Sequence, residues 1–458
     1  MNDLIVAFSI FYIGIVGIII FLNLQRNKMI EIFNPIIFYS ILWSIPFAII
    51  PLLIYFDILD PAYVLTKQNI KSIDIVISQL MAIISLISLT IGFAFGDKIK
   101  LMKSKALRLG NRWNNYGIFI VLLLYSLIII LNVKHGYETG TIFHGVDDLR
   151  EGTEELGFWS YIYVLFGINR VSFFYLCFLP LLSLMSYGYF KNKFYLFFSI
   201  SNIFFLITVS CLSGQKELLF SPLFVFLYYL YYIKNLMNLK KELFLITSLV
   251  LLIILIFPIF NLFRGYLNMV HQKPDLRQVM SLYTGNFSIE TIKQNLNYIF
   301  LRFDYLNTSL SIVDSDISFK FGYTYILGIL SFISSFPKMP KAEFMGVGFN
   351  NIFAREYGII DKFNYTTHIT LPSFVEVYMN FGFLSIPFCM FLYGLVYRKI
   401  YYLIKSDDLN WKLLGFYLWY IIVFQGSALA FSTIMFSLGR TIIPLIFVLL
   451  ILNYRWKS

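Results

Sequence analysis

The sequence predicts an all-α polytopic integral membrane protein with about eleven transmembrane helices and one long external helical loop. The chain is 59% hydrophobic and only 13% charged, and its mean hydropathy is +0.75. A soluble domain carries roughly 25% charged residues. Runs such as 4–24, 75–96 and 243–263 hold about twenty apolar residues each, which is the helix length needed to cross ~30 Å of hydrocarbon.

Each apolar run predicts one span. The predicted spans cover residues 4–24, 35–55, 75–96, 116–133, 160–187, 194–211, 218–233, 243–263, 373–396, 411–430 and 433–452. Only Met1, Asn2 and Asp3 precede the first run, and no small-residue cleavage site follows it, so we expect a retained helix rather than a signal peptide. Without an internal repeat or a linker, residues 1–458 are predicted to form a single membrane domain.

Basic residues orient these spans. The loops 25–34, 97–115, 188–193, 234–242 and 397–410, with Lys412 and the C-terminal tail, hold 19 basic and 5 acidic residues. Because Lys and Arg concentrate in cytoplasmic loops, we expect the N-terminus outside and the C-terminus in the cytoplasm. This distribution accounts for the net charge of +11, and nucleic acid is not expected as a partner.

Residues 264–372 are predicted to form a large external, periplasmic loop subdomain between the eighth and ninth spans. Apolar residues from Ile289 to Val313 recur at spacings of three and four, which predicts an amphipathic helix that lies on the membrane surface or roofs the spans. The uncharged stretch 321–336 is about sixteen residues long. A crossing there would move the later basic loops outside, so we expect a re-entrant or interfacial segment.

Several charged groups are candidates for function because charge is costly at membrane depth. Three are predicted in or near spans: Arg170, Glu376 and Arg440. Structural alternatives remain open, with Arg170 as an interfacial anchor and Arg440 as a partner of a carbonyl group or of Glu376.

Further basic groups are predicted on the outer side, where orientation does not require them. They are Lys216, Arg264, Arg277, Arg302, Arg355 and His368. Guanidinium groups bind phosphate through paired hydrogen bonds, so several together favour a pyrophosphate clamp. The alternative is that these residues solvate a loop that also contains eight acidic residues.

A proton acceptor is expected close to the ninth span. His368 precedes that span and could accept a proton from a hydroxyl group, or could serve only as a loop hydrogen-bond partner. Glu376 could orient His368, act as the base itself or pair with an arginine. The cysteines Cys177, Cys211 and Cys389 lie singly in apolar stretches and the four histidines are scattered, so no protein-held metal or cofactor is expected.

Four features carry a family resemblance. They are the Ser213-Gly-Gln-Lys-Glu217 turn before a span, the Phe263-Arg-Gly265 step after one, the long late external loop, and the segment from Thr370 to Gly382, Thr-Leu-Pro-Ser-Phe-Val-Glu-Val-Tyr-Met-Asn-Phe-Gly. On these features the chain resembles the bacterial O-antigen polymerase family, also called oligosaccharide repeat-unit polymerases. The architecture matches over nearly the whole chain, although Lys216 stands where members usually have arginine.

The resemblance implies a metal-independent glycosyltransferase of the GT-C kind at the outer face of the bacterial inner membrane. Such an enzyme transfers a growing glycan from its undecaprenyl diphosphate carrier onto a fresh lipid-linked repeat unit. The expected pyrophosphate-binding residues are Arg170, Arg264 and Arg302, with Lys216, Arg355 and Arg440 behind them. Either His368 or Glu376 would be the base, with Arg302 also in the catalytic set.

The partners implied by the resemblance are the lipid-linked oligosaccharide, membrane lipid, a flippase and chain-length regulator proteins. Two other functions remain open: a lipid-linked oligosaccharide flippase, which also needs arginines for pyrophosphate, and an O-antigen ligase. Flippases and transporters tend to have repeated halves and short loops, which this sequence lacks.

Overall fold

The computed structural model describes residues 2–56, 58–59, 71–97, 113–138, 177–213, 217–248, 305–314, 319–334, 349–358, 370–427 and 429–453. All regular structure in these ranges is helical. Four of the described helices are long and apolar enough to cross a membrane: Asp3–Asn27, Pro35–Tyr55, Ser72–Phe95 and Phe431–Asn453. They coincide with four predicted spans. The predicted total of eleven and the predicted orientation remain predictions.

The described helices belong to two compact units. Unit 1 comprises residues 1–103, 296–406 and 414–439, and unit 2 comprises residues 104–295, 407–413 and 440–458. Each unit therefore combines segments that are far apart in the sequence. The described residues of the predicted external loop, between 305 and 372, cluster with the first three predicted spans in unit 1.

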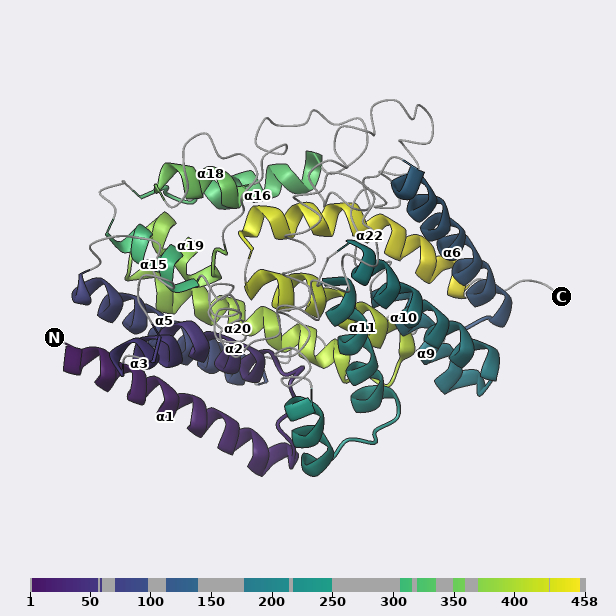
Figure 1. The fold of residues 1–458 in the computed structure, drawn as a ribbon, viewed down its shortest axis with the longest axis horizontal. Helices are drawn as coiled ribbons and strands as arrows, with labels where there is room; N and C mark the ends of the chain where they lie inside the picture. Colours follow the sequence, from purple (N-terminus) through teal and green to yellow (C-terminus); the bar gives the residue numbers. More distant parts are fainter. Residues whose placement is uncertain are drawn as a thin grey trace, which may run out of the picture. The chain divides into compact units, whose positions relative to one another are not determined.

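Unit 1 begins with α1 (Asn2–Asn27), which lies beside α2 (Pro35–Ser44) and α5 (Ser72–Phe95) (Figure 1). The Asn34 side chain accepts a hydrogen bond from the Ile36 N–H and caps α2, and Pro35 follows at the first helical position. A π-helical turn, η1 (Ile45–Ile49), connects α2 to α3 (Ile50–Tyr55), so the apolar run continues as one helical rod.

The lipid-facing character of α1 is visible in its side chains. Large apolar residues such as Ile10, Phe11 and Phe21 are more than half exposed. A soluble protein would bury a helix of this composition, whereas a bilayer solvates it. The exposed apolar surface of α1 therefore supports its position in a membrane.

A closely packed helix pair of unit 1 joins α5 to α20 (Ser385–Ile404). A Cβ atom at Gly92 would lie 2.1 Å from the Phe391 carbonyl oxygen, and one at Gly394 would lie 2.3 Å from the Leu89 carbonyl oxygen. No side chain fits at either position, so the two backbones are in direct contact. Small residues allow this close packing between apolar helices.

The predicted ninth span, 373–396, is divided in the structure. It forms α19 (Ser373–Phe381), a break at Gly382, and then α20, which continues to Ile404. Gly382 has φ of +78°, a conformation that glycine adopts without a Cβ clash. The prediction of one continuous helix over 373–396 was therefore wrong, although the residues on both sides of the break are helical.

The described part of the external loop contains three short helices: α15 (Tyr305–Val313), α16 (Tyr323–Ser334) and α18 (Phe349–Glu356). In α15 the polar residues Asn307, Thr308 and Ser309 are buried together with its apolar residues. The Ser309 hydroxyl forms a 2.9 Å hydrogen bond with the Ser78 hydroxyl of α5. This stretch of the predicted surface helix is therefore packed inside unit 1.

The last helices of the described chain follow α20. They are α21 (Leu409–Leu418), the π-helical turn η6 (Trp419–Phe424), the 3-10 turn η7 (Gln425–Ser427) and α22 (Phe431–Asn453). Residues 409–427 are thus helical over the tenth predicted span. The loop at 429–430 separates them from α22 over the eleventh.

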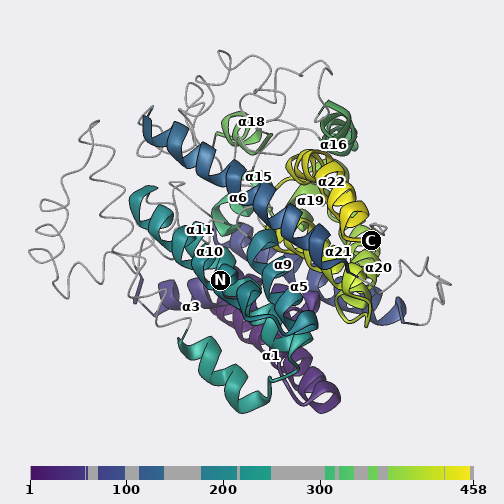
Figure 2. The same cartoon turned by 90° about the vertical axis from the view of Figure 1, so that its right-hand side faces the viewer.

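Unit 2 contains α6 (Asn115–Glu138), α9 (Leu179–Phe190), α10 (Lys193–Ser213) and α11 (Glu217–Tyr228), which η5 (Tyr229–Ile233) extends. Figure 2 shows α9, α10 and α11 side by side, and α6 also contacts α9. A sharp turn joins α9 to α10, where Lys191 has a φ of 57°.

Candidate functional site

The structure describes few of the predicted site residues. Glu376 and Arg355 are described with their side chains, and Arg440 is described only as part of the α22 backbone. The others lie outside the described residues: Arg170, Lys216, Arg264, Arg302 and His368. The predicted arginine clamp therefore stays a prediction, and the candidate site is built around Glu376.

Glu376 lies in α19, inside the segment that carries the family resemblance. Pro372 has extended backbone angles and starts the helix, because its ring fixes φ and leaves no N–H to satisfy. The Glu376 side chain points into the core, and the residue is only 1% exposed. A buried charge of this kind requires compensation from the atoms around it.

The Glu376 carboxylate caps the start of α22. Its Oε2 atom accepts a 2.8 Å hydrogen bond from the N–H of Phe431, which is the first residue of that helix. The free N–H groups at a helix start and the positive end of the helix dipole both favour a carboxylate. The Thr324 hydroxyl also donates a hydrogen bond to this carboxylate. Among the described residues Glu376 forms no ion pair, and its Oε1 atom has no hydrogen-bond partner.

Asn380 joins α19 to α16. Its side-chain nitrogen donates to the Thr324 hydroxyl at 2.7 Å and to the Glu376 carbonyl at 2.8 Å. In the adjoining turn the Phe321 N–H donates to the Asn380 carbonyl at 2.9 Å. Asn380 is completely buried, so these bonds hold the C-terminal half of α19 in a fixed position relative to α16.

A group of tyrosines lies in the same unit. The Tyr39 and Tyr397 hydroxyls are 2.8 Å apart and their rings stack, and Tyr39 also donates to the Val423 carbonyl at 3.1 Å. Tyr393 packs edge-on against Tyr397 and interacts electrostatically with Glu376. Buried hydroxyls require such partners, and this group fixes α2 to α20.

Arg355 is held by its own helix. Its Nε donates to the Asn351 side-chain oxygen, one turn earlier in α18, at 2.9 Å. The neighbouring Glu356 forms an ion pair with Lys320. The described contacts do not connect Arg355 with Glu376.

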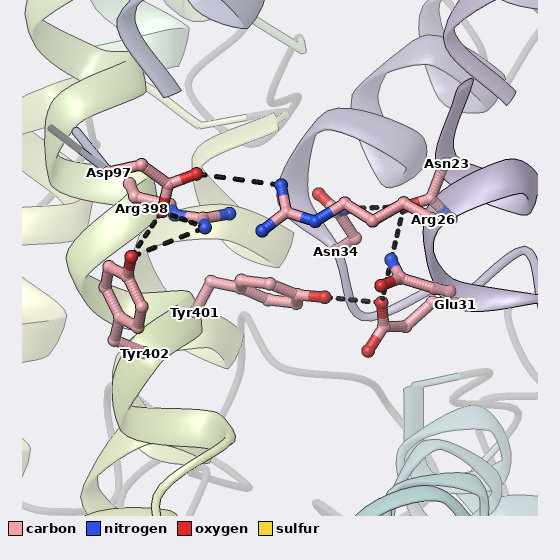
Figure 3. Close-up of polar contacts among 9 residues, drawn as sticks. Asn23, Arg26, Glu31, Asn34, Asp97, Arg398, Tyr401 and Tyr402 are labelled. Atoms are coloured by element: carbon pink, nitrogen blue, oxygen red, sulfur yellow. Dashed lines mark hydrogen bonds and ion pairs between the residues drawn. The ribbon is translucent and has the colours of Figure 1, made fainter. Parts of the chain in front are cut away.

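A second polar cluster lies at the C-terminal end of α5 (Figure 3). Arg398 forms an ion pair with Asp97 and lies over the rings of Phe93 and Tyr402, and Tyr402 donates a hydrogen bond to Asp97. Arg26 at the end of α1 approaches the same carboxylate at 3.6 Å. The residue Arg398 is only 4% exposed.

The pKa of Asp97 reflects these neighbours. Partial burial raises it, but the hydrogen bonds from Tyr402 and Arg398 and the positive charges of Arg398 and Arg26 outweigh that effect. The pKa of Asp97 is therefore held below its usual value of 3.8.

Glu31 completes this cluster. It is 3% exposed, accepts hydrogen bonds from Tyr401 and Asn27, and forms a 2.8 Å ion pair with Lys405. Asp97 and residues of the segments 25–34 and 397–410, which were all predicted on the cytoplasmic side, therefore meet at one end of α5. Lys71 and Asp314, which were both predicted on the outer side of the membrane, form a 3.7 Å ion pair at the N-terminal end of α5. The 24 residues of α5 separate the two ends by about 36 Å.

Sequence reasoning selected Glu376 but missed Asn380, Tyr397 and the burial of Arg398. A signal for Asn380 was present, because it lies four residues after Glu376 and thus on the same helix face. Tyr39, the hydroxyl partner of Tyr397, and Asp97, the ion-pair partner of Arg398, are each more than 300 positions away in the sequence. Periodicity within one helix contains no information about such partners.

Comparisons with known proteins do not assign the chain to a family. The chain matches no family model, no curated protein and no solved structure. Among the described residues, no group of three or more His, Cys, Asp or Glu side chains is arranged to hold a metal ion.

Proposed function

We propose that this chain polymerises undecaprenyl diphosphate-linked oligosaccharide repeat units at the outer face of a bacterial inner membrane. The observation that supports the proposal most is the packing of the segment 370–382. This segment carries the family resemblance, and it is anchored in unit 1 by Glu376 and Asn380. His368, the proposed base, lies two residues before this segment in the sequence, so it is followed directly by a segment that the structure holds in place.

In this proposal His368, not Glu376, accepts the proton of the acceptor hydroxyl. Glu376 is 1% exposed and its carboxylate caps α22, which favours a structural role. A base must come within hydrogen-bond reach of the hydroxyl that it deprotonates. A histidine at the end of the predicted external loop would meet this requirement better than a carboxylate inside the helical core.

The leaving group in the proposed reaction is the undecaprenyl diphosphate of the growing chain. The glycosidic bond between its first sugar and the diphosphate breaks, and the acceptor hydroxyl oxygen forms the new bond to that sugar. Negative charge develops on the diphosphate, and preorganised guanidinium groups stabilise it without a metal. The proposed clamp consists of Arg170, Arg264 and Arg302, supported by Lys216, Arg355 and Arg440.

The test is the length distribution of surface glycans from cells that lack the gene. Complementation uses the wild type, Arg302→Ala or His368→Ala, with Arg26→Ala as the control because Arg26 is exposed and predicted to be cytoplasmic. Loss of the ladder of long chains, leaving single-repeat products, is expected for the deletion and for the Arg302 and His368 variants. Arg26→Ala is expected to restore the ladder.

Two other outcomes would overturn the proposal. Lipid-linked repeats that accumulate on the cytoplasmic side would identify a flippase. Long lipid-linked chains that are never attached to their final acceptor would identify a ligase.

A further inference from the structure

Five side-chain oxygens in two segments of unit 1 are buried without a hydrogen-bond partner among the described residues. They are Thr370 Oγ1, Ser373 Oγ, Glu376 Oε1, Gln425 Oε1 and Ser432 Oγ. Ser373, Glu376 and Ser432 are 4%, 1% and 0% exposed. Buried oxygens without partners are rare, and each carries a desolvation cost, so several together indicate a missing ligand.

The two segments are joined at Glu376. The hydrogen bond from the Phe431 N–H to Glu376 Oε2 places Ser432 next to the carboxylate from the α22 side. Ser373 lies three residues before Glu376, on the same face of α19. The residues Ser373 and Ser432 thus lie close to Glu376, one along α19 and the other through the hydrogen bond at the start of α22.

The second segment also interrupts the helical backbone. Residues 425–427 form a 3-10 turn, and residues 429 and 430 lie outside helical structure before α22 begins. In membrane proteins such interruptions occur where the backbone is enclosed by protein or lines a site, and ion sites are built from them.

The chemistry of these oxygens selects a small, hard, singly charged cation. The burial of Ser373, Glu376 and Ser432 leaves access only to a small species. One carboxylate oxygen, three hydroxyls and one amide are all oxygen ligands, which hard cations prefer, whereas Ca²⁺ and Mg²⁺ sites usually contain more than one carboxylate or substrate phosphates. Among the described residues no basic side chain pairs with Glu376 to compensate its charge.

We propose that Glu376 Oε1, Ser373 and Ser432, with Thr370 and Gln425, bind a sodium ion that joins α19 to the start of α22. The site does not depend on the proposed polymerisation, because the ion binds inside the helical core and takes no part in glycosyl transfer. It differs from the His and Cys metal centres that the sequence analysis did not expect, since four of its five ligands are neutral oxygens.

The test is thermal unfolding of the purified full chain in detergent, with sodium, potassium or choline chloride at constant ionic strength. Sodium is expected to raise the melting temperature progressively. At a concentration about 100 times the Kd, it lowers the unfolding equilibrium constant about 100-fold. Potassium and choline are expected to have a much smaller effect.

Glu376→Gln, Ser373→Ala and Ser432→Ala are expected to remove the sodium response. The amide introduced by Glu376→Gln would still offer a side-chain oxygen to the Phe431 N–H, so this variant retains the cap while losing the charge. Ser85→Ala is the matched control, because the Ser85 hydroxyl is buried in the same unit and donates to the Met81 carbonyl at 2.6 Å. Its sodium response should equal that of the wild type.

The proposal is overturned if the three salts give the same melting temperature, as a bound water molecule would produce. It is also overturned if Ser432→Ala and Glu376→Gln keep the full sodium response. Binding of radiolabelled sodium to the wild-type protein provides a second readout that does not depend on how stable the variants are. Absence of saturable binding would contradict the site directly.

Discussion

Breaking the ion pair of Asp97 and Arg398 by removing the carboxylate is expected to destabilise unit 1. Substitution Asp97→Asn leaves the guanidinium of Arg398, whose side chain is 5% exposed, without its counter-charge. Removing one partner of a fully buried pair costs about 3–5 kcal/mol. The Asp97 side chain is 29% exposed and the neighbouring rings also stabilise Arg398, so we expect about 2 kcal/mol.

Arg26 provides the matched control for this prediction. Arg26 approaches the same carboxylate at 3.6 Å, but its side chain is 67% exposed. Solvent screens such a pair, so Arg26→Ala should cost no more than about 1 kcal/mol. The assay is reversible unfolding of the purified protein by a denaturing detergent in mixed micelles, with the free energy of unfolding compared between variants.

The pH dependence follows from the lowered pKa of Asp97. A carboxyl group whose pKa is lower in the folded state stabilises the fold at pH values above its unfolded pKa, near 3.8. That contribution is lost as the pH falls through the lower, folded pKa. The difference between the wild type and Asp97→Asn should therefore be constant from about pH 5 to 7 and shrink below about pH 4. Equal costs for Asp97→Asn and Arg26→Ala, or a difference independent of pH, would refute this reasoning.

Two further substitutions test the packing. Gly394→Ala would place a Cβ 2.3 Å from the Leu89 carbonyl oxygen, so we expect α5 and α20 to separate at a cost of about 1–3 kcal/mol in the same unfolding assay. The control is Gly14→Ala, where a Cβ would meet no atom within 4 Å. This variant should be neutral or stabilising. Asn380→Ala removes the bonds to the Thr324 hydroxyl and the Glu376 carbonyl and should cost about 1–3 kcal/mol. A neutral Asn380→Ala would show that α19 is held without that amide.

The long apolar helices could be predicted from the sequence because each depends on its own composition. The run 35–55 is an example: Asn34 and Pro35 mark its start, and the structure places a helical rod over the same residues. The break at Gly382 was not predicted, because apolar composition continues on both sides and only the backbone angle of one residue changes.

The candidate site shows the same limit. Glu376 could be selected because a charge in an apolar run is unusual, but its partner Phe431 is 55 positions away. Arg398 was assigned to the cytoplasmic loop 397–410, which follows the predicted span 373–396. In the structure α20 continues to Ile404, and Arg398 is buried against Asp97, which is 301 positions away. Non-local partners decide these outcomes, and one sequence does not specify them.

The most direct measurement of the proposed function uses the purified protein in lipid vesicles, supplied with undecaprenyl diphosphate-linked repeat units and no other enzyme. The account predicts products that lengthen by whole repeats, with one undecaprenyl diphosphate released for each repeat added and with no product from His368→Ala. Repeat units that remain single while the protein moves them across the vesicle membrane would contradict it.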